Sequence, residues 1–335
     1  MKVYICFKPK DEVVSFEGTR LRKTLKGACE VVDISWVDTP QEDVKIAHFM
    51  SPKDLAALRQ QKEKGVSTVV SAFYAEDDPE AGFLTSEKGD QLKPKALMML
   101  NEADLVLVPN EAGLELARRV GVTSHIEILE PAVRMNRFSK RSSEAKIFRR
   151  YFGVRPGVKT VVATGSYADR KTISFIKSIA RNCPNLDFYF FGAHSRYDVL
   201  KIAKSIARVR RSSNLHFKDA VQDDVYRSAL MDSVAYISND SLRPDPIAPL
   251  EAFASKTQVV AIASPNPNPL LVEGTSCFFF PSPEAIAKYL DSLNYPGAKS
   301  TIDTAYAIAK AHNLVSYGTT LKGYYEALLA SGAKR

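Results

Sequence analysis

Cysteine is scarce and scattered in this chain. The four cysteines, at positions 6, 29, 183 and 277, form no pair at metal-binding spacing and no dense cluster. A disulfide framework and a cysteine-based metal site are therefore excluded. We expect the protein to work in a reducing, cytoplasmic environment.

Long hydrophobic runs, low-complexity tracts and short repeats are also missing. No run approaches the roughly 18–20 uncharged apolar residues of a membrane span, and the first apolar stretch is too short for a signal peptide. With 45% hydrophobic and 25% charged residues, the composition excludes collagenous, coiled-coil and largely disordered chains. A length of 335 residues predicts two domains, at roughly 100–200 residues each.

Acidic residues are outnumbered by basic ones, 38 to 46, which gives a formal net charge of +8. The excess gathers in two stretches: nine cations against Glu144 in residues 134–159, and six against Asp198 in residues 196–211. Such surfaces attract nucleic acid, nucleotide phosphates or an anionic membrane, although two solvated helix faces would have the same composition. Interleaved aromatics and a helix-turn-helix motif are missing, so nucleic acid is not an expected partner.

Short apolar runs bounded by turn residues recur in two sets of six. Most are continuous, which is typical of strands buried on both faces of a sheet. Helical periodicity fills several gaps, at 111–120, 172–181, 197–209 and 316–329. This rhythm predicts an α/β fold of two Rossmann-like, doubly wound parallel-sheet domains with a cleft between them. The expected strands are 2–7, 30–34, 44–49, 67–73, 104–108, 126–129, 160–164, 186–191, 215–217, 233–237, 258–263 and 277–280.

The first loop of the second half has the features of an anion site. A strand ends at Thr164, Gly165 and Ser166 follow, and Arg170 and Lys171 come just before an expected helix. Glycine lets the backbone approach a ligand, and a helix N-terminus offers free N–H groups to an anion. Two cations there oppose the helix dipole, so a purely structural turn would tend to avoid them. A solvated basic turn is the alternative. The loop is neither a Walker A motif nor G-x-G-x-x-G, so a dinucleotide oxidoreductase is not indicated.

A second candidate is the proline-rich segment 245–261, where a short helix is expected to begin near Pro249. Glu251 would lie in its first turn, where a carboxylate suits the helix dipole. The carboxylate is either a helix cap or an acceptor of hydrogen bonds from a vicinal diol such as a ribose. The chemistry of the carboxylate alone does not favour one of these two roles over the other.

Four ordered blocks carry a family likeness. Residues 101–138 are similar to "ADxVIxxS…V(I)PNGVDxxxF", 162–171 to a phosphate loop, 216–234 to "VxFxGxVxxxxxxxYxxAD", and 249–261 to "PxLEAMAxGxPVVA". Together they resemble the retaining GT-B enzymes of glycosyltransferase family 4, over about two thirds of the chain. Residues 148–154, 165–171 and 190–194 also resemble the Firmicute glycolipid glycosyltransferases that make or extend glycosyl-diacylglycerols.

The resemblance implies a hexosyltransferase with an acceptor domain at 1–140, a nucleotide-sugar domain at 141–310, and a C-terminal helix at 311–335 that crosses back to the first domain. The donor would be a nucleotide-diphosphate sugar such as UDP-glucose, and the acceptor a glycolipid or saccharide hydroxyl. Anomeric configuration would be retained, and neither a cofactor nor a metal is implied. Residues 134–159 would dock the enzyme peripherally on the anionic inner face of the cell membrane.

The resemblance also implies roles for individual residues. Arg170 and Lys171 would neutralise the diphosphate, and Glu251 would hold the ribose; these three form the implied catalytic set. The backbone around Ala220 and Val221 would meet the base. The full set of further donor-binding residues is Gly18, Gly165, Ser166, Ala220, Val221, Asp245 and Leu250.

The chain departs from the family pattern at several positions. Arg243 stands where the first glutamate of a Glu-x(7)-Glu pair is expected, and Asp245 is the nearest carboxylate. Ser166 stands where an arginine is common, and the N-terminal glycine-rich loop is reduced to Gly18 and its neighbours. These departures leave open a non-catalytic homologue that acts as a partner subunit. A separate alternative, an enzyme of polysaccharide synthesis, keeps the chemistry and changes the acceptor.

Three residues of the first half are candidates for the acceptor side. His48 ends the third expected strand, and Glu76 and Asp78 follow the fourth. A lone histidine is also a common structural residue. The acidic cluster either contacts acceptor hydroxyls or mimics the metal motif of single-Rossmann glycosyltransferases. A second complete Rossmann half disfavours the metal role.

Overall fold

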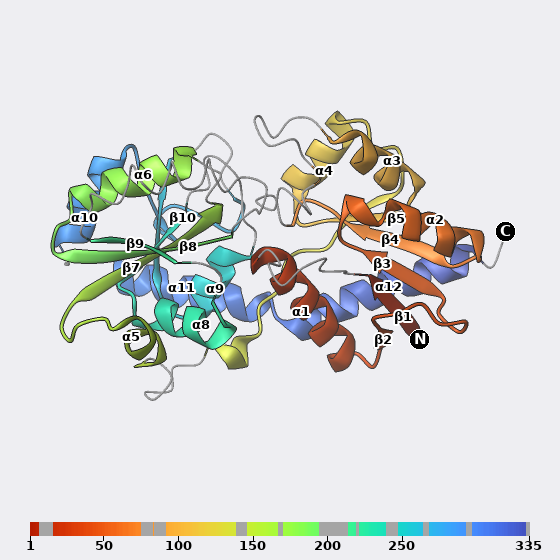
Figure 1. Cartoon of the computed structure of the whole chain (residues 1–335), viewed down its shortest axis with the longest axis horizontal. Coiled ribbons are helices and arrows are strands. Elements are labelled where there is room, and N and C mark those ends of the chain that lie inside the picture. Colours follow the sequence, from red (N-terminus) through yellow and green to blue (C-terminus); the bar gives the residue numbers. More distant parts are fainter. Residues whose placement is uncertain are drawn as a thin grey trace. The chain divides into compact units, whose positions relative to one another are not determined.

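The computed structural model describes residues 1–6, 16–74, 83, 92–138, 146–166, 170–193, 214–218, 221–238, 247–263, 268–292 and 297–332, with the backbone alone at 16–20, 166, 170, 193 and 332. The chain forms two units, each with its own sheet between layers of helices (Figure 1). Unit 1 comprises Met1–Ala132 and His312–Arg335, and unit 2 comprises Val133–Ala311. In these described ranges, no helix is long and apolar enough to cross a membrane.

Unit 1 is built on a six-stranded parallel sheet in the order β2-β1-β3-β4-β5-β6. Its central strands are buried because helices cover both faces, as parallel sheets require. Helices α2, α3 and α4 pack on one face, and α1 and α12 lie on the other (Figure 1). The strands are β1 (Lys2–Cys6), β2 (Ser35–Val37), β3 (Ile46–Phe49), β4 (Ser67–Ser71), β5 (Leu105–Val108) and β6 (Ile126–Ile128); the helices are α1 (Phe16–Val31), α2 (Leu55–Glu63), α3 (Pro94–Glu102), α4 (Glu111–Arg119) and α12 (Leu314–Gly332).

The last helix, α12, packs along α1 and completes unit 1. The two helices approach so closely at Gly318 that a β-carbon there would lie 2.8 Å from the carbonyl oxygen of Ala28. The hydroxyl of Tyr324 donates to the carbonyl of Ile128 on β6, at 2.8 Å. The end of the chain is therefore a structural layer of the unit in which the chain begins.

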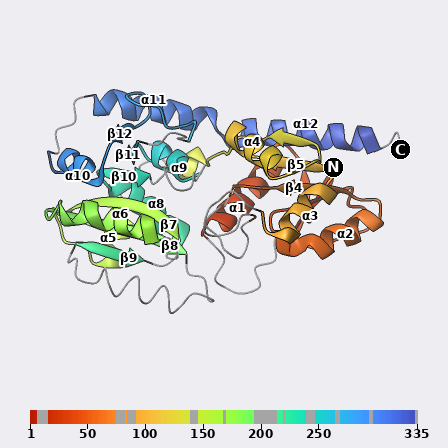
Figure 2. The ribbon, with the colours of Figure 1, turned by 90° about the horizontal axis from the view of Figure 1, so that it is seen from above.

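Unit 2 has a second six-stranded parallel sheet, in the order β12-β11-β10-β7-β8-β9. Figure 2 shows its strands in this order, from β9 to β12. Because side chains alternate along a strand, Val161 and Ala163 of β7 face α6 and α10, while Thr160 lies on the opposite face, near the end of α8. The strands are β7 (Lys159–Ser166), β8 (Leu186–Ala193), β9 (Leu215–Lys218), β10 (Ala235–Ser238), β11 (Gln258–Ile262) and β12 (Phe278–Phe280); the main helices are α5 (Ile147–Phe152), α6 (Arg170–Arg181), α8 (Asp223–Asp232), α9 (Ala248–Ala254), α10 (Pro283–Ser292) and α11 (Ala298–Ala311).

Two parallel, doubly wound sheets are present, so the predicted fold class is confirmed. One predicted strand, 30–34, is wrong, because Glu30 and Val31 complete α1, which buries Leu25 and Cys29 against the sheet. The helix ends before Asp33, whose positive φ of 56° is typical of a residue just past a helix, and β2 begins at Ser35. The predicted helix at 197–209 lies outside the described residues.

Replacing Gly318 with alanine is expected to destabilise unit 1, because the added methyl group would lie 2.8 Å from the carbonyl oxygen of Ala28 in α1. We expect the free energy of unfolding to fall by about 1–3 kcal/mol, the usual cost of overpacking. Gly323→Ala is the matched control in the same helix. No atom lies within 4 Å of its added β-carbon, so the higher helix propensity of alanine should stabilise the protein by about 1 kcal/mol. Denaturant unfolding measures both variants, and a stabilised Gly318→Ala protein would contradict the close contact.

Candidate functional site

Strands β7 and β10 lie side by side in unit 2, although β8 and β9 separate them in the sequence. From β7 the chain runs outward through β8 and β9, then returns to place β10 on the other side of β7. This reversal is a topological switch point, and doubly wound sheets bind ligands outside the carboxyl ends of their strands at such a point. The segments that follow β7 and β10 are the two segments that the sequence singled out.

A side-chain hydrogen bond joins β7 to β10 near their carboxyl ends. The hydroxyl oxygens of Thr164 and Tyr236 are 2.7 Å apart, and both side chains are buried. The bond adds to the backbone pairing in which Ile237 lies opposite Ala163. The two strand ends that carry the candidate segments are thus joined by backbone and side-chain bonds.

Gly165 follows Thr164 directly and has a φ of +155°, which side chains of L-residues rarely adopt. A β-carbon at this position would lie 3.2 Å from Cζ of Phe190 on β8 and 3.4 Å from Cγ2 of Thr172 on α6. The glycine therefore allows the first turn of α6 to pack against the end of β7. This close approach explains the glycine without a ligand, and it also leaves the backbone open to one.

Helix α6 begins at Arg170, slightly before the predicted start, so Arg170 and Lys171 are its first two residues. The Lys171 side chain is exposed, and the first turn contains no acidic residue. An anion at this end would meet the N–H groups of the helix, the positive end of its dipole and the ammonium group of Lys171. The geometry of α6 fits the predicted diphosphate position.

Helix α9 is short, and all seven of its residues are buried. It begins at Ala248, and Pro249 lies in its first turn, where a missing N–H costs nothing. Glu251 lies in the same turn and has an exposure of only 8%. A carboxylate withdrawn this far from water needs hydrogen-bond donors, which a cap on an exposed helix would obtain from solvent. Glu251 already interacts with other groups of the protein, so its burial is compatible with both roles that the sequence left open, helix cap and acceptor of hydrogen bonds from a ribose.

The other predicted donor residues are placed less directly. Val221 is half-buried just before α8, and the side chain of Leu250 is fully buried in α9, so a donor contact at Leu250 would come from its backbone. Ser166 ends β7, and Gly18 lies in the first turn of α1 in unit 1. The predicted residues outside the described ranges are Glu76, Asp78, Ala220 and Asp245.

His48, a predicted acceptor-side residue, lies in β3 with no exposed surface. Its Nδ1 is 2.6 Å from the hydroxyl of Tyr325 on α12, and its Nε2 is 2.8 Å from the hydroxyl of Ser71 at the end of β4. Burial lowers the pKa of the ring from 6.5 to about 3, so the imidazole is neutral at physiological pH. Both ring nitrogens are engaged within unit 1, where they join α12 to the sheet. This geometry fits the structural role that the sequence left open, and it offers no free ring atom to an acceptor.

Metal ligands do not gather in the part of the chain that the structure describes: no three His, Cys, Asp or Glu side chains there are placed to hold an ion. The acidic residues Glu76 and Asp78 fall outside it. All four cysteines are buried free thiols. Burial raises the pKa of Cys183 to about 11 and that of Cys29 to about 12, so neither is fit to act as a nucleophile.

The basic stretch 134–159 contains two cations that are held by internal ion pairs. Nη1 of Arg137 lies 2.8 Å from a carboxylate oxygen of Asp223, at the start of α8. Nε of Arg149 lies 2.8 Å from a carboxylate oxygen of Asp232, at the end of the same helix. The two ion pairs attach α5 and the residues before it to α8. Because a carboxylate compensates each charge, these two arginines contribute little to attraction toward an anionic membrane.

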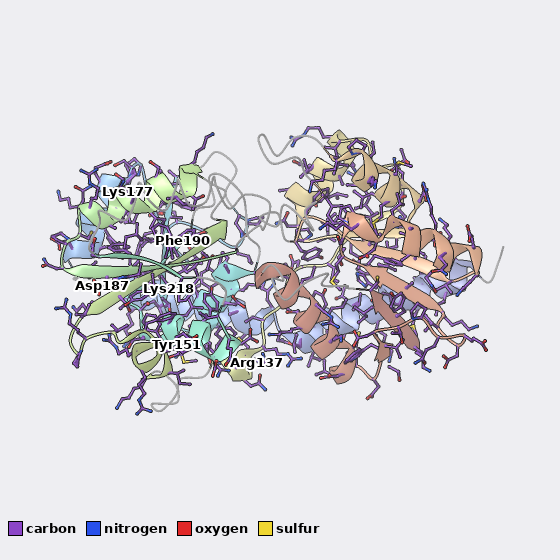
Figure 3. All side chains as sticks on the ribbon, viewed as in Figure 1. Arg137, Tyr151, Lys177, Asp187, Phe190 and Lys218 are labelled. Carbon is purple, nitrogen blue, oxygen red and sulfur yellow. The ribbon has the colours of Figure 1, made fainter. Side chains whose placement is uncertain are left out.

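Other cations of the stretch are exposed. Lys146 precedes α5, Arg150 lies in it, Arg155 follows it and Lys159 begins β7, and all four are exposed. Tyr151 of α5 is 63% exposed. We call these five residues the α5 face. Figure 3 shows Tyr151 on the side of the sheet opposite α6. The α5 face combines positive charge with an exposed aromatic ring.

Sequence reasoning missed the buried partners of the polar side chains. Tyr236 brings a polar hydroxyl group into a largely apolar strand. Tyr325 follows Leu321 at helical spacing on the buried face of α12. A polar group inside an apolar pattern was the available signal. Its partner was not readable, because the bonds join residues 72 and 277 positions apart.

No known protein-family model matches the chain. A curated processive diacylglycerol alpha-glucosyltransferase from Acholeplasma laidlawii is 22% identical over 234 residues, which cover 68% of each chain. The solved structure of HepE from Anabaena, in complex with UDP and glucose, has a TM-score of 0.74 at 14% identity and covers 97% of this chain and 99% of HepE. Sucrose-phosphate synthase from Thermosynechococcus elongatus has a TM-score of 0.73 at 12% identity, with coverage of 98% and 99%.

Unit 1 is expected to lose stability as the pH falls below about 6.5, partly through His48. The unfolded ring binds a proton near its ordinary pKa of 6.5, whereas the folded ring stays neutral down to about 3. The contribution is therefore complete above pH 6.5 and is lost as the pH falls between these two values. Between pH 7 and pH 5 the loss is about 2 kcal/mol.

His48→Gln keeps a hydrogen-bonding side chain that does not titrate in this range, so it should flatten the decline by a similar amount. Hydrogen exchange of the α12 amides at pH 7 and pH 5 measures the difference. Equal pH dependence in the two proteins would contradict a buried, neutral His48.

Proposed function

We propose that this chain, which has the GT-B fold that its resemblance to glycosyltransferase family 4 predicted, transfers a hexose from a nucleotide-diphosphate sugar to a hydroxyl of a membrane glycolipid. The observation that carries the proposal is the switch point of unit 2, where the segments after β7 and β10 bring Lys171 and Glu251 to one edge of the sheet. The complex of HepE with UDP and glucose, and the Acholeplasma diacylglycerol alpha-glucosyltransferase, support this donor and this acceptor. UDP-glucose is the first donor to test.

The proposed reaction forms one bond and breaks one bond at the anomeric carbon. The acceptor oxygen bonds to that carbon as the bond from the carbon to the diphosphate oxygen breaks. The leaving oxygen takes up the acceptor proton on the same face of the sugar, so the configuration is retained without the carboxylate pair that a glycosidase needs. Catalysis then depends on stabilising the negative charge that develops on the diphosphate, and on positioning.

The donor contacts follow from the two segments. Arg170, Lys171 and the N-terminal N–H groups of α6 would hold the diphosphate, with Gly165 and Ser166 as its backbone neighbours. Glu251 would accept hydrogen bonds from the ribose hydroxyls. The backbone around Ala220 and Val221 would face the base, and Asp245 and Leu250 would complete the donor site.

Lys171→Ala is expected to lower turnover roughly 10²–10³-fold, the scale for removing one preorganised electrostatic donor. Stability should change little, because the side chain is exposed. Lys177→Ala is the matched control, since this cation is six residues, or about 9 Å, further along α6. Figure 3 labels Lys177 on that helix. Initial rates of glucose transfer from UDP-glucose and thermal unfolding measure both variants. Near-normal turnover after replacement of both Arg170 and Lys171 by alanine would remove the diphosphate assignment.

We also propose that the reaction needs no divalent cation. Lys171 and the terminus of α6 would supply the positive charge that a bound metal supplies in other sugar transferases. EDTA should therefore leave the initial rate essentially unchanged. If EDTA abolishes transfer and Mn²⁺ restores it, the acidic residues Glu76 and Asp78 become the candidate ligands and metal independence is wrong.

The glycolipid acceptor requires the enzyme to meet a membrane surface, and the α5 face suits this contact. Each cation near an anionic leaflet contributes about 1 kcal/mol, and the attraction decays over about 8 Å at physiological salt. An exposed tyrosine is suited to the boundary between lipid and water, because its ring is apolar and its hydroxyl is polar. We propose peripheral binding of the α5 face to the anionic inner leaflet.

In liposome flotation, the protein should bind vesicles that contain anionic lipid, be released as the salt concentration rises, and ignore neutral vesicles. Replacing Arg150 and Arg155 with glutamate should abolish binding. The matched control replaces Arg181 and Lys288, exposed cations of α6 and α10, with glutamate at the same net charge change. If the wild-type protein binds neither vesicle type at low salt, the membrane acceptor is wrong and a polysaccharide acceptor is favoured.

A further inference from the structure

Side-chain hydrogen bonds hold β7 at both ends of its pairing with β10 (Ala235–Ser238) and with the residues just before β10. At the amino ends, the hydroxyl oxygens of Thr160 and Ser233 are 3.1 Å apart. Near the carboxyl ends, those of Thr164 and Tyr236 are 2.7 Å apart. Thr160 and Thr164 lie on the same face of β7, because they are four residues apart and side chains alternate along a strand. The Thr160 hydroxyl also lies 3.4 Å from a carboxylate oxygen of Asp232, and the Ser233 hydroxyl donates to the carbonyl of Ala229 at 2.7 Å, so the amino-end bond is part of a larger network.

Packing alone does not require hydroxyl groups at the carboxyl end. Thr164 and Tyr236 are buried on the same face of the sheet as Val162, and valine and phenylalanine would fill similar space. A buried hydroxyl must be hydrogen-bonded or it destabilises the protein. The pair therefore adds a specific distance constraint between the strands, which an apolar pair would not provide.

The carboxyl-end bond lies directly beneath the proposed donor site. Thr164 precedes Gly165, which leads to Lys171 on α6, and Tyr236 is two residues from the end of β10, after which the chain leads to Glu251 on α9. A change in the spacing of the two strand ends would move the diphosphate contacts relative to the ribose contact. Displacements of about 1 Å at such contacts have large effects on binding and rate.

We propose that Thr164 and Tyr236 are positioning residues for the donor nucleotide: their hydrogen bond sets the spacing between the segment that holds the diphosphate and the helix that holds the ribose. This inference rests on the proposed function, because it assigns the pair to the same donor site. The two side chains act through the segments that they join and do not touch the donor. The bond at the amino ends has a purely structural role.

The test compares isosteric changes at the two ends of the strand pair. Thr164→Val and Tyr236→Phe remove the carboxyl-end bond. Thr160→Val and Ser233→Ala remove the amino-end bond, together with the contact of Thr160 to Asp232 or that of Ser233 to Ala229. All four variants should lower the melting temperature. Only the first two should raise the KM for UDP-glucose and the Kd for UDP, by roughly tenfold, while the KM for the acceptor stays unchanged. Thr164→Ser, which keeps the hydroxyl, should restore both values.

The outcomes separate this inference from the proposed function. If wild-type protein binds UDP and transfers glucose, but the two ends affect donor binding equally, the positioning role is wrong and the donor site stands. An unchanged KM in Thr164→Val and Tyr236→Phe, with a lowered melting temperature, also overturns the positioning role. If wild-type protein binds neither UDP, GDP nor ADP, the proposed function falls and this inference falls with it.

Discussion

The pairing of β7 with β10 is the interaction on which the site in unit 2 depends. Parallel strands present their carboxyl ends at one edge of a sheet, so placing these two strands together also places together whatever follows them. One segment leads into α6 with a cation at its start, and the other leads into α9 with a buried carboxylate. Positive charge and a hydrogen-bond acceptor are complementary to the diphosphate and the diol of a nucleotide. The cation and the carboxylate are brought together because the strand order of the sheet places β7 next to β10.

Both units place a small polar contact inside an otherwise apolar layer. In unit 1, His48 is hydrogen-bonded to Ser71 on β4 and to Tyr325 on α12, and in unit 2 Thr164 is hydrogen-bonded to Tyr236 on the neighbouring strand. Such contacts are directional, whereas apolar packing tolerates small shifts. They therefore specify where a helix or a strand end lies. In unit 1 the result is a fixed α12, and in unit 2 it is a fixed spacing below the proposed donor site.

The fold could be predicted well from the sequence, because the patterns that mark strands and helices involve residues close together in the chain. Continuous apolar runs mark strands buried on both faces, and this pattern located β5, β7 and β11 closely. It failed at 30–34, because α1 continues through Val31 and a short apolar run does not distinguish the end of a helix from a strand. Lys171 and Glu251 stay predicted donor contacts; the sequence singled them out because each lies at the start of a helix. The partner of His48 was not identifiable, since no local pattern connects β3 to a helix near the end of the chain.

The central claim is that the donor nucleotide binds at the switch point of unit 2. The most direct test is a crystal structure of the protein with UDP. The account predicts the diphosphate at the N-terminus of α6, within hydrogen-bond distance of Lys171, and the ribose hydroxyls at the carboxylate of Glu251. A nucleotide bound elsewhere, for example at the sheet edge of unit 1, would contradict the account.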